Sequence, residues 1–296
     1  MMAYTRLSIL FLMLAFSVAV SAQREVIHEE RSQYRNVLVT EFNGQRCMLF
    51  NIHRGDMNQT CIDLRNPQRL VFNYTKMSFA GLLLNPDPDN ILVAGLGGGT
   101  IPMVMRELFP EATIDVLEVD QAVVNVAKEF FNYEEDQRHQ VHVVDARVFI
   151  KRAGLQGRQY DYIVLDAFSG EYIPEHLLTL EFLQEVKTLL SDDGVVVANT
   201  FASSQLYDYE SVTYQAAFGE FYNFKRAGSG NRIIIAMKSE LPPQGELRQP
   251  ARDLYERLLP YDINILEYPA LLSTRPDWDE SARVLTDQFS PANLLN

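Results

Sequence analysis

Residues 90–120 read NILVAGLGGGTIPMVMRELFPEATIDVLEVD. An apolar strand over 90–97 runs into a glycine-rich turn, a helix follows through Phe109, and a second apolar strand covers 113–120. Strands of almost continuous Val, Ile and Leu that alternate with helices are typical of a parallel sheet covered on both faces. This stretch therefore predicts a doubly wound, Rossmann-like α/β sheet.

The same alternation continues toward the C-terminus. Further strands are predicted over 141–146, 160–167 and 195–201. Helices are predicted over 77–84, from Arg147, over 176–190 and near 208–218. Segments 221–228 and 232–238 are predicted to finish the sheet as an antiparallel pair.

The regions on either side of this alternation have a different character. Residues 23–76 alternate short apolar runs with turn residues such as Asn43-Gly44, which predicts a small N-terminal domain of antiparallel β-hairpins. Residues 240–296 are richer in proline and charge, and we predict a C-terminal extension with one helix. The Rossmann-like domain is then expected over 77–239.

The first 22 residues resemble a secretory signal peptide. Arg6 supplies a positive charge, residues 7–20 are mostly apolar, and Val20-Ser21-Ala22 offers a cleavage site before Gln23. The apolar run of about 14 residues is shorter than the roughly 18–20 needed to span a bilayer. We therefore predict export to the periplasm or beyond, with no stable membrane span after cleavage. The alternative is an uncleaved N-terminal membrane anchor.

Net charge, cysteines and histidines limit the classes of partner and ligand that the protein can bind. The formal net charge of −13 argues against nucleic acid, because nucleic-acid-binding proteins normally carry a basic face. It suits a cationic small molecule, although an acidic solvated surface is also common. Cys47 and Cys61 flank a predicted hairpin turn, so they either form a cross-strand disulfide or remain buried thiols. The five histidines are scattered without metal-ligand spacing, so no metal is expected.

Ligands of a doubly wound sheet bind at the carboxyl ends of its strands. The candidate cofactor residues at the first three strand ends are the turn glycines Gly95, Gly97, Gly98 and Gly99, then Glu118, then Asp145-Ala146. Glycines allow close approach of a ligand to the backbone. Glu118 has the spacing of an acid that accepts hydrogen bonds from ribose hydroxyls, while Asp120 is suited to cap the next helix. Asp145 is either an adenine acceptor or a helix cap. Asp166, at the fourth strand end, is the candidate catalytic carboxylate.

These strand ends, in this order, resemble the spermidine synthase (polyamine aminopropyltransferase) family over about residues 31–238. The resemblance extends to Gln59, to Phe72-Asn73-Tyr74, and to the ending 285–291, LTDQFSP, which is similar to a divergent branch containing transporter-fused homologues. It implies the fold of class I AdoMet-dependent methyltransferases and, as co-substrate, decarboxylated S-adenosylmethionine or S-adenosylmethionine. It also implies a small cationic amine substrate and a homodimer. Gln59 would help to hold the cofactor, and Asp166 with Tyr74 would orient and deprotonate the amine.

The chain departs from the family pattern where the family has acids. Neutral residues stand at three of these places, namely Gly98, Ser169 and Phe201, and a late tyrosine-bearing loop is reduced to 228–231. Replacement acids could come from Glu171, Asp208 or Glu210. The sequence therefore leaves three functions open. They are aminopropyl transfer, methyl transfer from intact S-adenosylmethionine, and non-catalytic binding of a nucleoside or polyamine outside the cytoplasm.

Overall fold

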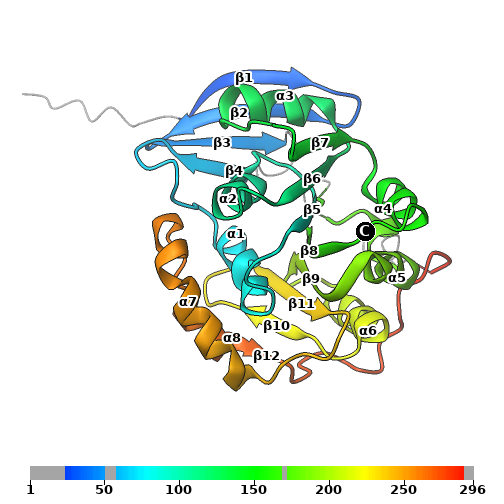
Figure 1. Ribbon diagram of the computed structural model, residues 1–296. Helices are drawn as coiled ribbons and strands as arrows, with labels where there is room; N and C mark the ends of the chain where they lie inside the picture. The colour runs from blue at the N-terminus through cyan, green and yellow to red at the C-terminus, as the bar shows by residue number, and fades with distance from the viewer. Residues whose placement is uncertain (1–23, 51–57, 169–171, 290–296) are drawn as a thin grey trace, which may run out of the picture.

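The computed structural model describes residues 24–50, 58–168 and 172–289 (Figure 1). The predicted signal peptide, the predicted hairpin turn near 53–56, Ser169 and Glu171 lie outside these residues. Within them, no helix has the length and apolar character needed to cross a bilayer.

The N-terminal part forms a four-stranded antiparallel sheet, as expected. Its strands, in spatial as well as chain order, are β1 (Glu25–Arg31), β2 (Asn36–Phe42), β3 (Gln45–Phe50) and β4 (Asn58–Asp63). Asn43 and Gly44 join β2 to β3 with φ values of 51° and 77°. Two successive residues with positive φ are what a tight hairpin turn requires, so the Asn-Gly pair sets the register here.

Cys47 on β3 lies directly opposite Cys61 on β4, and the two form a disulfide. This settles the choice between a cross-strand bond and free thiols. The bond fixes β4 to β3 close to Gln59, which is a candidate cofactor-binding residue.

We expect loss of this disulfide to lower the free energy of unfolding by about 3 kcal/mol, because closing a loop of about 15 residues restricts the unfolded chain. Chemical denaturation of wild type and of Cys47→Ser/Cys61→Ser, each with and without reductant, measures this. The double variant should be insensitive to reductant. A wild-type midpoint that reductant does not move would contradict the prediction.

The main sheet has eight strands in the order β12-β10-β11-β9-β8-β5-β6-β7. The strands are β5 (Asn90–Ala94), β6 (Thr113–Glu118), β7 (His139–Val143), β8 (Tyr160–Leu165), β9 (Leu190–Phe201), β10 (Tyr222–Lys225), β11 (Asn231–Met237) and β12 (Leu272–Ser273). Strands β5 to β9 are parallel, whereas β10, β11 and β12 pair antiparallel. The chain order reverses between β5 and β8, and a crevice for a ligand forms at such a switch point.

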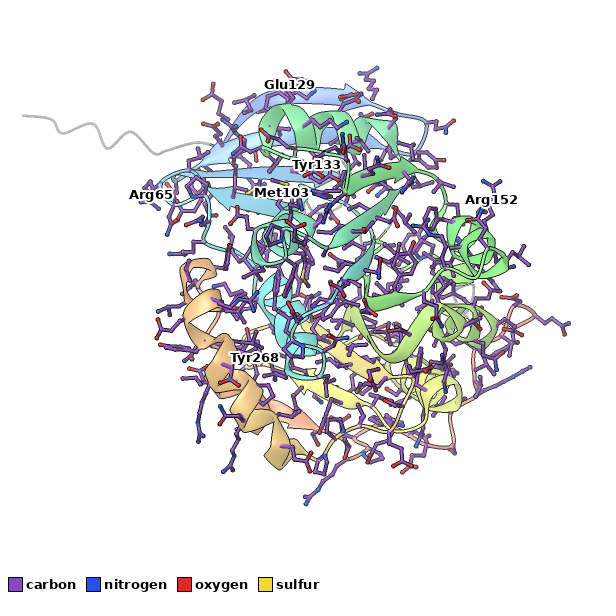
Figure 2. The ribbon with its side chains drawn as sticks, viewed as in Figure 1. Arg65, Met103, Glu129, Tyr133, Arg152 and Tyr268 are labelled. Carbon is purple, nitrogen blue, oxygen red and sulfur yellow. A yellow bond between two sulfur atoms is a disulfide. The ribbon has the colours of Figure 1, made fainter. Side chains whose placement is uncertain are left out.

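Two apolar layers enclose the sheet. One face is covered by α1 (Asn73–Met77), the 3-10 helix 78–83, α2 (Thr100–Leu108) and α7 (Arg248–Leu258). The other face is covered by α4 (Ala146–Leu155), α5 (Leu180–Leu189) and α6 (Tyr207–Phe218). Helix α3 (Gln121–Phe130) lies between the two sheets, because its apolar residues face both of them (Figure 1). The short α8 (Tyr268–Leu271) packs on β10 through contact between Tyr268 and Phe224. Tyr268 is labelled in Figure 2.

Some expected boundaries shift. The helix expected at 77 begins at Asn73, inside the predicted N-terminal domain, so Tyr74 lies in its first turn. The helix expected over 176–190 is a 3-10 turn over Glu175–Leu177 followed by α5 from Leu180. Thr179 causes the separation, because its hydroxyl accepts a hydrogen bond from the Phe182 backbone and starts a new helix.

The C-terminal extension is part of the main fold and not only the appended helix that the sequence had indicated. Its strand β12 completes the edge of the main sheet, and its tail returns across α5. The Asp287 carboxylate accepts two hydrogen bonds from the Arg147 guanidinium at 2.6 and 2.8 Å, and Glu185 pairs with the same guanidinium. The last described residues are thereby tied to α4, beside the wall of the crevice.

Candidate active site

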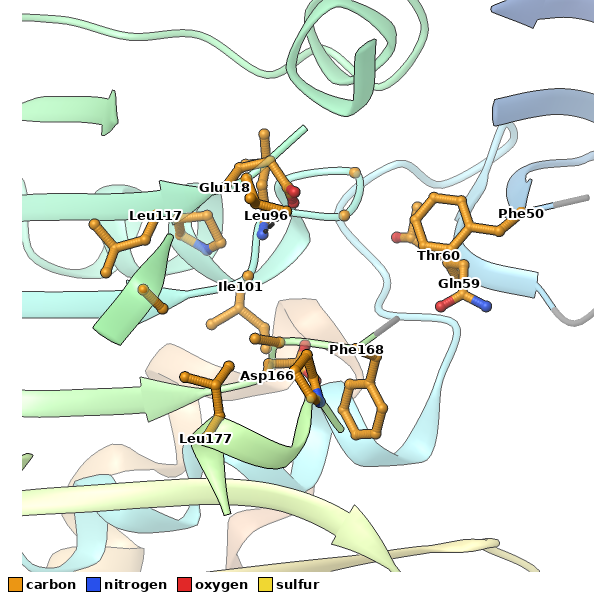
Figure 3. A pocket seen from close by; sticks show the side chains of 18 of the residues that line it. Phe50, Gln59, Thr60, Leu96, Ile101, Leu117, Glu118, Asp166, Phe168 and Leu177 are labelled. Carbon is orange, nitrogen blue, oxygen red and sulfur yellow. Dashed lines mark hydrogen bonds between the residues drawn. The ribbon is translucent and has the colours of Figure 1, made fainter. Parts of the chain in front are cut away.

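A cavity of about 260 Å³ lies at the carboxyl ends of β5, β6 and β8. Figure 3 shows Glu118 and Asp166 on the side of the main sheet, with Gln59, Thr60 and Phe50 reaching in from the N-terminal sheet. The cavity therefore forms between the two sheets, and both are needed to build it.

The glycine turn after β5 forms one wall. Gly95 has φ 105°, and a Cβ atom there would lie 2.2 Å from the Asp166 carbonyl oxygen. Only glycine therefore lets this turn lie against the loop after β8. Gly97 and Gly98 also line the cavity. Gly99 does not: it precedes α2 with φ 76° and faces Tyr133, which is labelled in Figure 2.

Glu118, the last residue of β6, points into the cavity. Its carboxylate accepts hydrogen bonds from the backbone of Leu96 at 3.3 Å and of Asp120 at 3.0 Å. Burial raises the pKa of Glu118, while these hydrogen bonds and the Arg35 guanidinium act in the opposite direction. Asp120 caps α3 through the Ala122 N–H, as expected.

Asp145 lines the cavity and is also a helix cap. One carboxylate oxygen accepts from the Val148 N–H at 3.0 Å, which starts α4, and the other lies 2.8 Å from Nε2 of His176. Ala146 and His176 line the same wall. The two roles that the sequence left open for Asp145 are thus compatible in one side chain.

Asp166 follows β8 directly and accepts a hydrogen bond from the Asn199 amide at 2.8 Å. Burial raises the pKa of Asp166 to about 7, against a smaller opposing effect of that hydrogen bond. The Tyr74 hydroxyl donates to the Gln59 carbonyl oxygen at 3.1 Å. Burial and the nearby Asp166 raise the pKa of Tyr74 well above its ordinary value, so this hydroxyl stays protonated.

The structure explains why position 98 carries no acid. A Cβ atom on Gly98 would lie 2.6 Å from Cγ2 of Thr60 and 3.0 Å from the Phe131 ring. The Thr60 hydroxyl is in turn hydrogen-bonded to the Thr100 hydroxyl at 3.0 Å. The space that an acidic side chain would need is therefore filled by Thr60.

Of the replacement acids considered, neither described candidate lines the cavity. Glu210 is buried on α6 and bound to Arg232 at 3.0 Å, so the suggestion that it supplies a missing charge is wrong. Asp208 accepts a hydrogen bond from the Asp279 backbone instead. Phe201 packs edge-on against Phe168 at 5.2 Å, which makes this end of the site aromatic.

Sequence reasoning missed several lining residues, among them Arg35, Phe50, Thr60 and His176. All lie outside the strand ends of the main sheet, and no pattern along the chain points to them.

The doubly wound sheet, its glycine turn and the acids at its strand ends define the class I AdoMet-dependent methyltransferase-type fold, and this fold prediction is confirmed. The model of the spermine/spermidine synthase domain matches residues 72–227. Over 276 residues, 92% of both chains, the sequence is 52% identical to the polyamine aminopropyltransferase of Vibrio vulnificus. The chain belongs to the spermine/spermidine synthase family.

Methyltransferases are also similar. The eEF1A lysine and N-terminal methyltransferase of Mus musculus is 32% identical over 241 residues, which are 76% of this chain and 33% of that protein. The structure of human methyltransferase-like protein 13 in complex with SAH is 27% identical, with a TM-score of 0.58, over 74% of this chain and 100% of that one. A probable spermidine synthase from Corynebacterium glutamicum shares the fold, with a TM-score of 0.66 at 18% identity over 88% and 99% of the chains.

Proposed function

We propose that this protein moves an aminopropyl group from decarboxylated S-adenosylmethionine to a small cationic amine. The observation that carries the proposal is that Glu118, Asp145 and Asp166 all line one cavity, in a chain 52% identical to a polyamine aminopropyltransferase. Nucleoside recognition needs the first two acids, and amine recognition needs the third.

The cavity fits the nucleoside half of such a co-substrate. A carboxylate can accept about four hydrogen bonds, so Glu118 retains capacity for two ribose hydroxyls beyond its two backbone donors. Apolar side chains of Leu96, Ile101 and Leu177 supply contact area for a ring system. The residues present thus match the polar and apolar parts of adenosine.

Asp166 has the properties of a group that orients an amine and accepts its proton. With a pKa of about 7 it is ionised in part of the molecules at neutral pH and can bind a proton without a large penalty. In the transfer, the neutral amine nitrogen bonds to the methylene carbon beside the sulfonium. The carbon–sulfur bond breaks, methylthioadenosine leaves, and the amine proton passes to Asp166. Positioning of the two reactants in line supplies the remainder of the catalysis.

Methyl transfer from intact S-adenosylmethionine is the second candidate. It is favoured by Gly98, because a neutral residue there avoids repulsion of the methionine carboxylate, and by the similarity to methyltransferases. Calorimetry with methylthioadenosine, decarboxylated and intact S-adenosylmethionine separates the two. Tightest binding of the intact form would contradict aminopropyl transfer.

We expect Glu118→Gln to weaken binding of methylthioadenosine about ten- to hundred-fold, because a charged acceptor for the ribose hydroxyls is lost. Calorimetry on wild type and variant measures the change. Glu111→Gln, an exposed position, is the matched control and should bind as wild type. Unchanged affinity in Glu118→Gln would show that the nucleoside binds elsewhere.

We also propose that the protein is exported and that the mature chain begins at Gln23. The pairing of Cys47 with Cys61 supports an oxidising compartment. Mass spectrometry of the protein purified from its source should find Gln23 at the N-terminus. An intact Met1 in the cytosolic fraction would contradict export.

A further inference from the structure

Arg35 brings a positive charge into a cavity that the acids Glu118, Asp145 and Asp166 also line. It lies in the turn between β1 and β2, and hydrogen bonds to Ser32 and Asp120 fix the position of this turn. The Arg35 backbone N–H donates to the Ser32 hydroxyl at 3.1 Å, and that hydroxyl donates to Asp120 at 2.6 Å. Because Asp120 caps the helix that follows Glu118, the turn is fixed relative to the candidate ribose site.

Two contacts position the guanidinium of Arg35: its face stacks on the Phe50 ring, and one nitrogen donates a hydrogen bond to Phe168. Its central carbon lies 4.2 Å from the centre of the Phe50 ring, and Nη1 donates to the Phe168 carbonyl oxygen at a long 3.4 Å. Within the described residues, no ion pair of 4.0 Å or less joins Arg35 to a carboxylate, although its charge acts on Glu118 across the cavity. Stacking on an aromatic face leaves the edge of a guanidinium available for paired hydrogen bonds to a carboxylate.

The surroundings make this charge unfavourable for a purely cationic pair of substrates. A sulfonium and an ammonium are both repelled by a guanidinium in a partly desolvated cavity. Position 98 offers no compensating acid, because Thr60 occupies the space that one would need. A ligand that carries a carboxylate would remove the repulsion and satisfy the guanidinium.

We propose that Arg35 is the carboxylate-binding residue of this cavity, and that one of the two bound ligands carries a carboxylate. The inference rests on the nucleoside site of the proposed function. A carboxylate on the donor would favour the second candidate, methyl transfer, whereas a carboxylate on the acceptor is compatible with aminopropyl transfer. The carboxylate has two sources. It belongs either to the donor, as in intact S-adenosylmethionine, or to the acceptor, as an amine that carries an α-carboxylate.

Calorimetry with the intact protein tests both sources by matched pairs. S-adenosylhomocysteine and its decarboxylated counterpart differ in the carboxylate of the donor. Ornithine and putrescine differ in the carboxylate of the acceptor, and they are titrated with methylthioadenosine saturating. In one pair, the carboxylated member should bind more tightly to wild type, and Arg35→Gln should weaken that member alone, by about ten- to hundred-fold.

Two further variants control for structure and charge. Arg35→Lys keeps the charge without the planar fork and should retain part of the preference. Arg65→Gln removes an exposed arginine at the outer edge of the N-terminal sheet (Figure 2) and should bind all ligands as wild type.

The same titrations distinguish failure of the role proposed for Arg35 from failure of the proposed function. If methylthioadenosine binds normally but Arg35→Gln weakens both members of each pair equally, or neither, the role of Arg35 is overturned and the proposed function stands. If methylthioadenosine does not bind to wild type, the nucleoside site is refuted and the role of Arg35 with it.

Discussion

Asp166→Asn should reduce aminopropyl transfer by about 10²- to 10⁴-fold, because it removes the group that orients the amine and accepts its proton. Asparagine keeps the size of the side chain and can still accept the hydrogen bond from Asn199. Binding of methylthioadenosine should therefore be unchanged. Single-turnover rates with saturating donor and amine measure the effect, and Asp193→Asn, an exposed change at the start of β9, is the control.

The pH dependence of catalysis follows from the raised pKa of Asp166. The pKa of Asp166 is raised to about 7, so the base form accumulates as pH rises through 7. We expect kcat/KM of the wild type to rise with pH across this range and the residual rate of Asp166→Asn to lack that limb. A wild-type profile that is flat between pH 6 and 8 would exclude Asp166 as the titrating base.

The raised pKa of Asp166 also predicts that the protein loses stability as pH rises, while catalysis increases. The folded pKa of about 7 exceeds the ordinary value of 3.8, so the folded state binds the proton more tightly than the unfolded state. Stability contributed by this group is therefore present below the ordinary value and is lost as pH rises toward 7. Above pH 7, Asp166→Asn should be more stable than wild type, by no more than about 4 kcal/mol.

Arg232→Met should destabilise the protein by about 3–5 kcal/mol, because it leaves Glu210 buried without its cation. Arg232 has no exposed surface. It donates to Glu210 at 3.0 Å, to the Ser211 hydroxyl at 2.6 Å and to the Thr200 hydroxyl at 2.9 Å. Burial raises the pKa of Glu210 to about 7 even beside this guanidinium. Chemical denaturation at pH 8 measures the loss, since the uncompensated charge is costly there.

The double variant Arg232→Met/Glu210→Leu separates a buried charge from a cavity. Removing both charges should recover most of the lost stability, as replacement of a buried ion pair by apolar side chains often does. A double variant as unstable as the sum of the two single variants would show that packing, and not the unpaired carboxylate, carries the cost.

The acids of the site were predictable because parallel strands place their ends along one edge. Glu118, Asp145 and Asp166 each follow an apolar run, and the pleat and the switch point bring the three to one crevice. The pairing of Cys47 with Cys61 was one of two open outcomes, because hairpin register brings the residues opposite but does not fix the redox state.

Other parts of the site depend on contacts that no local pattern encodes. Arg35 lines the cavity because its turn is held by a hydrogen bond from Ser32 to Asp120, which are 88 residues apart in the sequence. Glu210 looked available as an acid, but the orientation of α6 turns it toward Arg232. The two-residue strand β12 is too short to show periodicity, and the sheet edge beside β10 determines it.

The tail that ends at Asp287 has a consequence for biogenesis. Arg147 emerges from the ribosome 140 residues before its partner Asp287. Strand β10 likewise precedes β12, with Asn223 paired to Ser273. A nascent chain therefore exposes an incompletely neutralised arginine and an open strand edge until these later residues have been translated. Truncation shortly after β11 should therefore yield a product that proteases degrade.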